Sequence, residues 1–203
     1  MTTLPAASGI DLREAKRAVR ERIVRARDVM PADLRAQASR KIVTTLVARP
    51  DFAAAKVVLM TLSFGSEWDT RPLLATALSH GKTVAIPRVN AGRRMLELHA
   101  VCDLAEDVAP GYRGILEPRG HCAAVAIETI DWILVPGVAF DAHGRRIGDG
   151  GGYYDRLLPT LPATALRIAG AFEVQLVDRV PTAPHDLALD AIVTEARVIV
   201  PAP

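Results

Sequence analysis

The sequence predicts an α/β fold in which a mainly parallel sheet is covered by helices on both faces. After Pro50, short runs rich in β-branched and aliphatic residues alternate with segments of helical periodicity, which is the pattern of strand–helix–strand units. Half of the 203 residues are hydrophobic, so the composition supports a sizeable core. We find no internal repeat or linker and expect one domain over residues 1–203, with residues 1–10 flexible.

Two helices are expected before the alternating part begins. In the first, over residues 11–27, apolar residues recur at three- and four-residue spacing and form one stripe. At about 100° per residue, Lys16 and Arg20 lie at the border of this stripe. A cation there can reach into a cleft; alternatively it covers apolar surface and keeps its charge in water. The stripe consists of Leu12, Ala15, Val19 and Ile23.

The remaining elements follow in order along the chain. Pro31 suits the first turn of a second helix over residues 32–48. The run at 95–101 fits either a strand of the sheet or an excursion from it, and 105–118 has the turn signals of a loop. Strands are expected at 56–62, 83–86, 130–135, 167–172, 189–194 and 198–200, and further helices at 70–79 and 154–161.

Composition excludes several classes of function. The balance of 25 Lys+Arg against 23 Asp+Glu gives a formal charge of +2, too small for a general nucleic-acid binder. Cys102 and Cys122 form no CxxC motif, and the histidines, among them His121, show no ligand spacing, so neither a zinc site nor a disulfide framework is indicated. No apolar run approaches the roughly 20 residues that span a bilayer. We expect a cytoplasmic protein.

The segment from Arg146 to Arg156 carries four glycines in five positions and is typical of a phosphate-binding loop. Converging backbone N–H groups bind phosphate oxygens, and the arginines add positive charge. Asp155 fits if a divalent cation bridges its carboxylate to the phosphates. The segment lacks the Gly-Lys-Ser/Thr ending of a Walker loop and does not open a dinucleotide-binding helix. A surface turn is the alternative.

Two other polar segments have candidate roles. Residues 63–70 follow a strand, so they and the glycine loop are both expected at the carboxyl edge of the sheet, where ligands bind in such folds. Asp69 or Thr70 caps the next helix, which leaves Glu67 without a structural task. Its carboxylate suits an amine or an amide-rich heterocycle, unless it is simply solvated. Asp186 suits Mg²⁺ together with Asp155, unless it belongs to an ordinary turn.

Several motifs agree in order and spacing with those of a known family. The most specific are the glycine loop ending in Gly-Tyr-Tyr-Asp and the Val-Pro-Gly strand end before it. The motifs are Lys16-Arg17-Ala18-Val19-Arg20, Ser66-Glu67-Trp68-Asp69-Thr70, Ala85-Ile86-Pro87-Arg88, Gly114-Ile115-Leu116-Glu117-Pro118, Val135-Pro136-Gly137-Val138-Ala139-Phe140-Asp141, the loop itself and His185-Asp186. Together they resemble the 5-formyltetrahydrofolate cyclo-ligase (5,10-methenyltetrahydrofolate synthetase) family.

The resemblance implies an enzyme that uses Mg-ATP to convert 5-formyltetrahydrofolate into 5,10-methenyltetrahydrofolate, releasing ADP and phosphate. It also implies a three-layer α/β/α sandwich related to sugar-phosphate isomerases and CoA transferases. We expect a monomer that binds neither nucleic acid nor a membrane. A folate- or nucleotide-binding paralogue without this activity is the alternative. An isomerase or transferase activity is disfavoured because neither explains a Mg²⁺-compatible glycine loop.

By the same resemblance, individual residues acquire roles. Arg146 and Lys16 are implied as catalytic, and Asp155 and Asp186 as Mg²⁺ ligands. The implied ATP contacts are Lys16, Arg20, Arg146, Ile147, Gly148, Asp149, Gly150, Gly151, Gly152, Tyr153 and Tyr154. The implied folate contacts are Arg20, Leu62, Glu67, Gly150, Gly151, Gly152 and Tyr153.

Asp149 departs from the family pattern, which usually has an aromatic or basic residue at this position. A carboxylate beside phosphate is repelled unless it faces solvent, an arginine or a metal. At an effective dielectric constant of about 20, two charges roughly 4 Å apart interact by about 4 kcal/mol. The sequence therefore predicts weaker ATP binding unless Asp149 points away.

Overall fold

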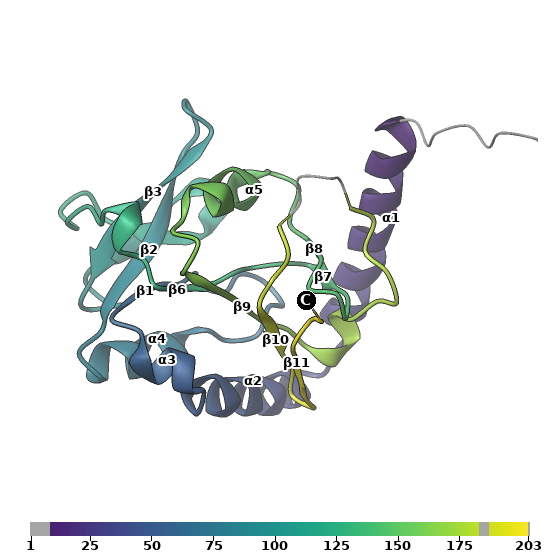
Figure 1. Cartoon of the computed structure of the whole chain (residues 1–203), viewed down its shortest axis with the longest axis horizontal. Coiled ribbons are helices and arrows are strands. Elements are labelled where there is room, and N and C mark those ends of the chain that lie inside the picture. The colour runs from purple at the N-terminus through teal and green to yellow at the C-terminus, as the bar shows by residue number, and fades with distance from the viewer. Residues whose placement is uncertain (1–8, 183–186, 203) are drawn as a thin grey trace, which may run out of the picture.

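The protein forms a seven-stranded sheet with helices on both faces (Figure 1), seen in a computed structural model that describes residues 9–182 and 187–202. The strand order is β11-β10-β9-β6-β1-β2-β3. Its parallel centre consists of β1 (Val57–Leu59), β2 (Thr83–Asn90), β6 (Trp132–Leu134), β9 (Leu166–Gly170) and β10 (Ala191–Val193). Its antiparallel edges are β3 (Met95–Val101) and β11 (Val198–Ile199). The expected α/β class and mainly parallel sheet are confirmed. Of the residues 1–10 expected to be flexible, 1–8 lie outside the described residues, and α1 begins at Gly9.

Two expectations about the middle of the chain need correction. The strand expected to end at residue 86 continues to Asn90 through Pro87, which lies beyond the β1 register and pairs only with β3. The missing N–H of Pro87 therefore breaks no bond to β1. The loop expected at 105–118 contains a hairpin of β4 (Val108–Pro110) and β5 (Leu116–Pro118), with η1 (Tyr112–Gly114) at its tip. Strands this short leave no readable alternation in the sequence.

The helices cover the sheet as the alternation predicts. In Figure 1, α2 (Ala32–Val47), α3 (Pro50–Ala54) and α4 (Arg71–Ser79) lie on one face, and α5 (Tyr153–Leu157) lies on the other. The long helix α1 (Gly9–Asp28) flanks the sheet beside the small hairpin of β7 (Ala139–Phe140) and β8 (Arg146–Ile147). The short turns η2 (Ile127–Thr129), η3 (Leu158–Thr160) and η4 (Glu173–Gln175) complete the described elements.

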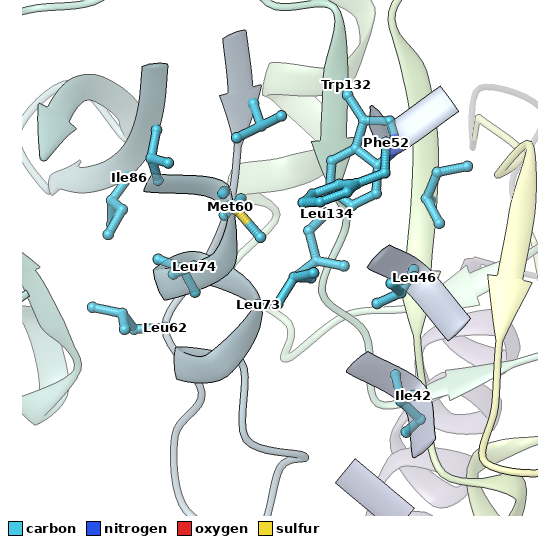
Figure 2. Packing of buried hydrophobic residues seen from close by; sticks show 14 of the residues in the cluster. Ile42, Leu46, Phe52, Met60, Leu62, Leu73, Leu74, Ile86, Trp132 and Leu134 are labelled. Atoms are coloured by element: carbon cyan, nitrogen blue, oxygen red, sulfur yellow. The ribbon is translucent and has the colours of Figure 1, made fainter. Parts of the chain in front are cut away.

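Separate hydrophobic clusters join these layers. Under α2–α4, the fully buried Phe52 packs edge-on against Trp132, with ring centroids 5.3 Å apart, and Leu73 lies beside them (Figure 2). On the opposite face, α5 and η3 pack against β6 and β9. Ile23 of the predicted apolar stripe packs with Val138 and Ile147, which fixes α1 beside the glycine loop.

Side chains also connect the loops at the carboxyl ends of the parallel strands. Trp68, in the loop after β1, donates its Nε1–H to the Gly170 carbonyl at the end of β9 (2.7 Å). Gln175 donates its amide to the carbonyls of Gly137 and Val138 (3.1 and 3.0 Å), just after β6. Because both side chains are buried, these bonds are shielded from water and hold three loops in register.

We predict that Gly170→Ala destabilises the protein by about 1–3 kcal/mol, the usual cost of overpacking. A Cβ on Gly170 would lie 2.5 Å from Cζ2 of Trp68, so the ring and its hydrogen bond must move. Gly120→Ala is the matched control, because a Cβ there meets nothing within 4 Å. Urea unfolding measures both variants. Equal stability of the two would show that Trp68 does not need this close approach.

Candidate functional site

A cleft of about 340 Å³ opens at the carboxyl edge of the sheet. One wall is the loop of residues 63–71 after β1, and the other includes Gly114 and Leu116 of the β4–β5 hairpin. Polar residues line most of it, and the half-exposed ring of Phe64 adds an apolar surface. The predicted position of the 63–70 segment at this edge is confirmed.

Glu67 lies in this cleft as a half-buried carboxylate. Its Oε2 accepts the Phe64 N–H at 3.0 Å, and its Oε1 lies 3.8 Å from Nη1 of Arg27. Burial raises the pKa of Glu67 above its usual value, by more than the Phe64 N–H and Arg27 lower it; the negative charge of Asp149 adds to the rise. Glu67 therefore has a binding environment rather than a fully solvated one.

Arg27 is a site residue that the sequence reasoning missed. It is only 7% exposed, and its Nε donates to Ser66 Oγ at 2.9 Å while Ser66 in turn donates to Asp28. Its Nη1 has no hydrogen-bond partner among the described residues. The sequence does contain an indication of this role, because Arg27 follows Arg20 by seven residues and so lies on the same face of the helix.

Of the two residues expected to cap α4, Thr70 and Asp69, only Asp69 accepts a backbone N–H of the helix. Thr70 occupies the N-cap position of α4 but makes no capping bond with its side chain; its hydroxyl instead accepts the Ser63 N–H at 2.9 Å. Asp69 accepts the Arg71 N–H at 3.1 Å. Neither interaction involves Glu67, whose own contacts are with the Phe64 N–H and Arg27.

The glycine loop follows β8 and leads into α5. Arg20 reaches it from α1, donating Nε–H to the Gly148 carbonyl at 2.9 Å. Its guanidinium also lies 3.6 Å from where a Cβ on Gly150 would be, and Gly150 has a φ of +98°. The positive φ favours glycine at this position, whereas 3.6 Å is an ordinary contact distance for a Cβ. Arg20 therefore contacts the glycine loop, although it is not among the residues that line the cleft; its role toward a ligand stays a prediction.

Arg146 and Asp155 form an ion pair at the base of the loop. Arg146 Nη2 donates to Asp155 Oδ1 at 2.6 Å. The arginine side chain is 6% exposed, whereas the aspartate is 53% exposed. Arg146 Nε is buried without a hydrogen-bond partner among the described groups, so a polar ligand would satisfy it.

Asp149 is paired with an arginine of the β4–β5 hairpin. Its Oδ2 lies 3.2 Å from Nη1 of Arg113 at the tip of the β4–β5 hairpin, and both side chains are largely exposed. Arg113 was not identified from the sequence, because only the tertiary fold brings the hairpin to the loop. Asp149 thus faces both an arginine and solvent, the two arrangements that reduce its repulsion of phosphate.

Tyr153 and Tyr154 have different neighbours, as their adjacency predicts. Tyr153 packs edge-on against Tyr112 of the hairpin, with ring centroids 5.9 Å apart, and the Arg156 guanidinium lies 5.2 Å from its ring. Tyr154 is turned inward; burial raises the pKa of its hydroxyl. That hydroxyl is buried with no partner of good geometry among the described residues.

The other predicted residues differ in accessibility. Leu62 and Ile147 are buried at 3% and 2% exposure, and neither lines the cleft. Lys16 is half-buried on α1, four residues before Arg20. Asp186 lies outside the described residues. Asp190 is at the opposite, amino edge of the sheet, where it accepts the Arg167 N–H at 2.7 Å.

One carboxylate of the predicted Mg²⁺ pair can therefore be placed. Asp155 is half exposed beside the loop, and its Oδ1 is paired with Arg146. Mg²⁺ is usually held by one or two carboxylates together with substrate phosphates and water. Asp155 fits such a shared ion, and the described residues around the loop form no cluster of three protein ligands.

Comparison with known proteins agrees with this geometry. Residues 12–195 match the 5-formyltetrahydrofolate cyclo-ligase family. The 5-formyltetrahydrofolate cyclo-ligase of Escherichia coli K12 is 32% identical over 76% of this chain and 86% of its own length. A mitochondrial cyclo-ligase of Arabidopsis thaliana is 32% identical over 91% of this chain and 75% of its own.

Solved structures give the same result. The 5,10-methenyltetrahydrofolate synthetase of Aquifex aeolicus superposes with a TM-score of 0.81 at 32% identity, covering 91% of this chain and 92% of that one. A synthetase from Mycoplasma pneumoniae, at 21% identity and a TM-score of 0.73 over 89% of this chain and 98% of that one, shares the fold. The chain therefore belongs to the 5-formyltetrahydrofolate cyclo-ligase family, as its motifs predict.

Proposed function

We propose that this enzyme uses Mg-ATP to convert 5-formyltetrahydrofolate into 5,10-methenyltetrahydrofolate, releasing ADP and phosphate. One observation carries the proposal. The arginine-flanked glycine loop and the cleft containing Glu67 lie at the same edge of the sheet. The ion pair of Asp149 with Arg113 joins the glycine loop to the hairpin that forms one wall of the cleft. A triphosphate on the loop and a pterin in the cleft would then be adjacent.

The chemistry requires this proximity. The N5-formyl oxygen is a poor leaving group, and phosphorylation activates it. The formyl oxygen attacks the γ-phosphorus, ADP departs and an iminium phosphate forms. N10 then adds to the formyl carbon, its proton is lost and phosphate leaves as the ring closes. Such phosphoryl transfer depends mainly on positioning and on neutralising charge.

The chain provides groups for both tasks. Arg20, Lys16 and the loop N–H groups would hold the phosphates. The buried guanidinium of Arg146, fixed by Asp155, would face developing negative charge at low reorganisation cost. Bound Mg²⁺, held in part by Asp155, would supply further charge neutralisation. Glu67 would orient the pterin by accepting hydrogen bonds from its ring N–H groups.

Other properties remain predictions. No helix within the described residues is both long and apolar enough to cross a bilayer. A monomeric state, a cytoplasmic location and the absence of a nucleic-acid partner therefore stay predictions. The absorbance of methenyltetrahydrofolate, followed during ATP-dependent turnover, tests the activity. Tight folate binding without ADP release would instead indicate a non-catalytic paralogue.

We predict that Asp155→Asn lowers kcat by about 100-fold or more, the usual effect of losing a preorganised charged contact. Asparagine still accepts a hydrogen bond from Arg146, so the fold should be retained, but at lower stability because the buried guanidinium loses its counter-charge. The Mg²⁺ concentration for half-maximal rate should rise. Absorbance assays across a Mg²⁺ series measure both effects, with exposed Asp103→Asn as the control. Full activity at unchanged Mg²⁺ dependence would remove Asp155 from the metal site.

We predict that Arg113→Gln raises KM for ATP several-fold, because Asp149 then repels phosphate without its partner. An uncompensated charge at the surface changes the binding free energy by about 1 kcal/mol, which corresponds to roughly a fivefold change in KM. The double variant with Asp149→Asn should recover much of this loss, and high salt should reduce the effect. An unchanged KM in Arg113→Gln would contradict screening by Arg113.

We predict that Glu67→Gln weakens folate binding by about 10- to 100-fold, because a charge-assisted hydrogen bond contributes about 1.5–3 kcal/mol. Although the substitution weakens binding, it should increase the free energy of unfolding. Since the folded pKa lies above 4.5, ionisation disfavours the folded state, so the variant should gain stability relative to the parent as pH rises through and above 4.5.

Urea unfolding at several pH values and folate titration of the same samples test these two effects together. Exposed Glu106→Gln is the control for loss of a negative charge. A stability difference between Glu67→Gln and the parent that stays constant with pH would refute the burial of this carboxylate.

A further inference from the structure

Three side chains of metal-ligating type meet at the base of the β4–β5 hairpin, at the far end from its cleft-lining tip. Asp107 immediately precedes β4, and His121 and Cys122 follow β5 by a few residues. A carboxylate oxygen of Asp107, a ring nitrogen of His121 and Sγ of Cys122 all lie within 4.8 Å of one another. None of these residues takes part in the function proposed above.

The backbone holds this cluster in place. Asp107 Oδ2 accepts N–H bonds from Cys102 and Asp103 at 2.7 and 2.9 Å, which orients Oδ1 toward His121 Nε2 at 3.0 Å. Cys122 is 9% exposed, and its thiol lies 3.4 Å from the Asp107 carbonyl. The Arg119 N–H donates to the same carbonyl at 2.7 Å. Asp107 is thus preorganised as a ligand.

The donor set and spacing select the kind of metal. Zinc binds thiolate sulfur at about 2.3 Å and imidazole nitrogen or carboxylate oxygen at about 2.0–2.2 Å, with tetrahedral geometry. Such bonds place ligand atoms about 3.3–3.6 Å apart, within reach of the observed spacing after small side-chain rotations. Mg²⁺ and Ca²⁺ prefer oxygen ligands only, so thiol and imidazole disfavour them.

We propose that Asp107, His121 and Cys122 bind a zinc ion that fastens the base of the β4–β5 hairpin. The ion takes the place of the hydrogen between His121 Nε2 and Asp107 Oδ1, with neutral His121 carrying its proton on Nδ1, and the thiol proton of Cys122 is released to solvent. Water completes the coordination on the side of His121, whose side chain is 61% exposed. The ion joins the segment before β4 to the segment after β5, and so braces the hairpin that presents Arg113 and Gly114 to the cleft.

Cobalt(II) titration of the reduced, metal-stripped full chain tests this site without relying on activity. We expect one equivalent to give a thiolate-to-cobalt charge-transfer band, and zinc to remove it. Cys122→Ser should abolish the band. His121→Gln should weaken binding by more than the roughly 10- to 100-fold that loss of an outer-shell partner costs. Cys102→Ser is the matched control, since Cys102 is exposed and its thiol is outside the three-atom group.

Thermal unfolding gives a second measurement on the same proteins. Zinc should raise Tm of the parent and of Cys102→Ser, but not of Cys122→Ser. The exposed His121 variant keeps the test valid if Cys122→Ser folds poorly. Absence of stoichiometric uptake, an unchanged affinity in His121→Gln, or a band that depends on Cys102 instead would overturn the proposal and leave an ordinary Asp107–His121 ion pair.

Discussion

The parallel pairing of β1 with β6 is the constraint on which the candidate site depends. From β1 the chain passes under the sheet through α4 to β2, whereas from β6 it passes over the opposite face through α5 to β9. The loops therefore separate where β1 and β6 end, which opens a crevice at the carboxyl edge. Trp68 and Gln175 hold those loops in register from within the core. Every charged group of the site is positioned relative to this edge.

The charges of the site differ mainly in how far they are removed from water. Arg146 is buried and needs the carboxylate of Asp155, because an unpaired buried charge is strongly destabilising. Arg27 is equally buried and lies near Glu67. Asp149 and Arg113 are exposed, so their pairing contributes little to stability. Water and an arginine therefore both moderate the charge of Asp149.

The β4–β5 hairpin links two regions with different chemistry. Its tip has a strained residue, Arg113, at a left-handed φ of 55°, beside the Tyr112–Tyr153 contact. Its base contains the cluster of Asp107, His121 and Cys122. A hairpin of two three-residue strands has little stability alone, so contacts at each end determine its position. Bracing the base would therefore also affect how firmly the tip forms the cleft wall.

The hairpins β4–β5 and β7–β8 and the short helix α3 were not predicted from the sequence. Local patterns did predict helices α1, α2, α4 and α5, most strands of the main sheet, the glycine loop at its carboxyl edge, and the different neighbours of Tyr153 and Tyr154. These follow from local periodicity and from rules of parallel sheets, which operate over neighbouring residues. Three groups of contacts appear only in the folded chain: Arg113 with Asp149, Arg27 with Glu67, and His121 and Cys122 with Asp107. The histidine and cysteine showed no ligand spacing because the hairpin that unites them with Asp107 is built from long-range pairing, and such contacts leave no periodic pattern in the chain.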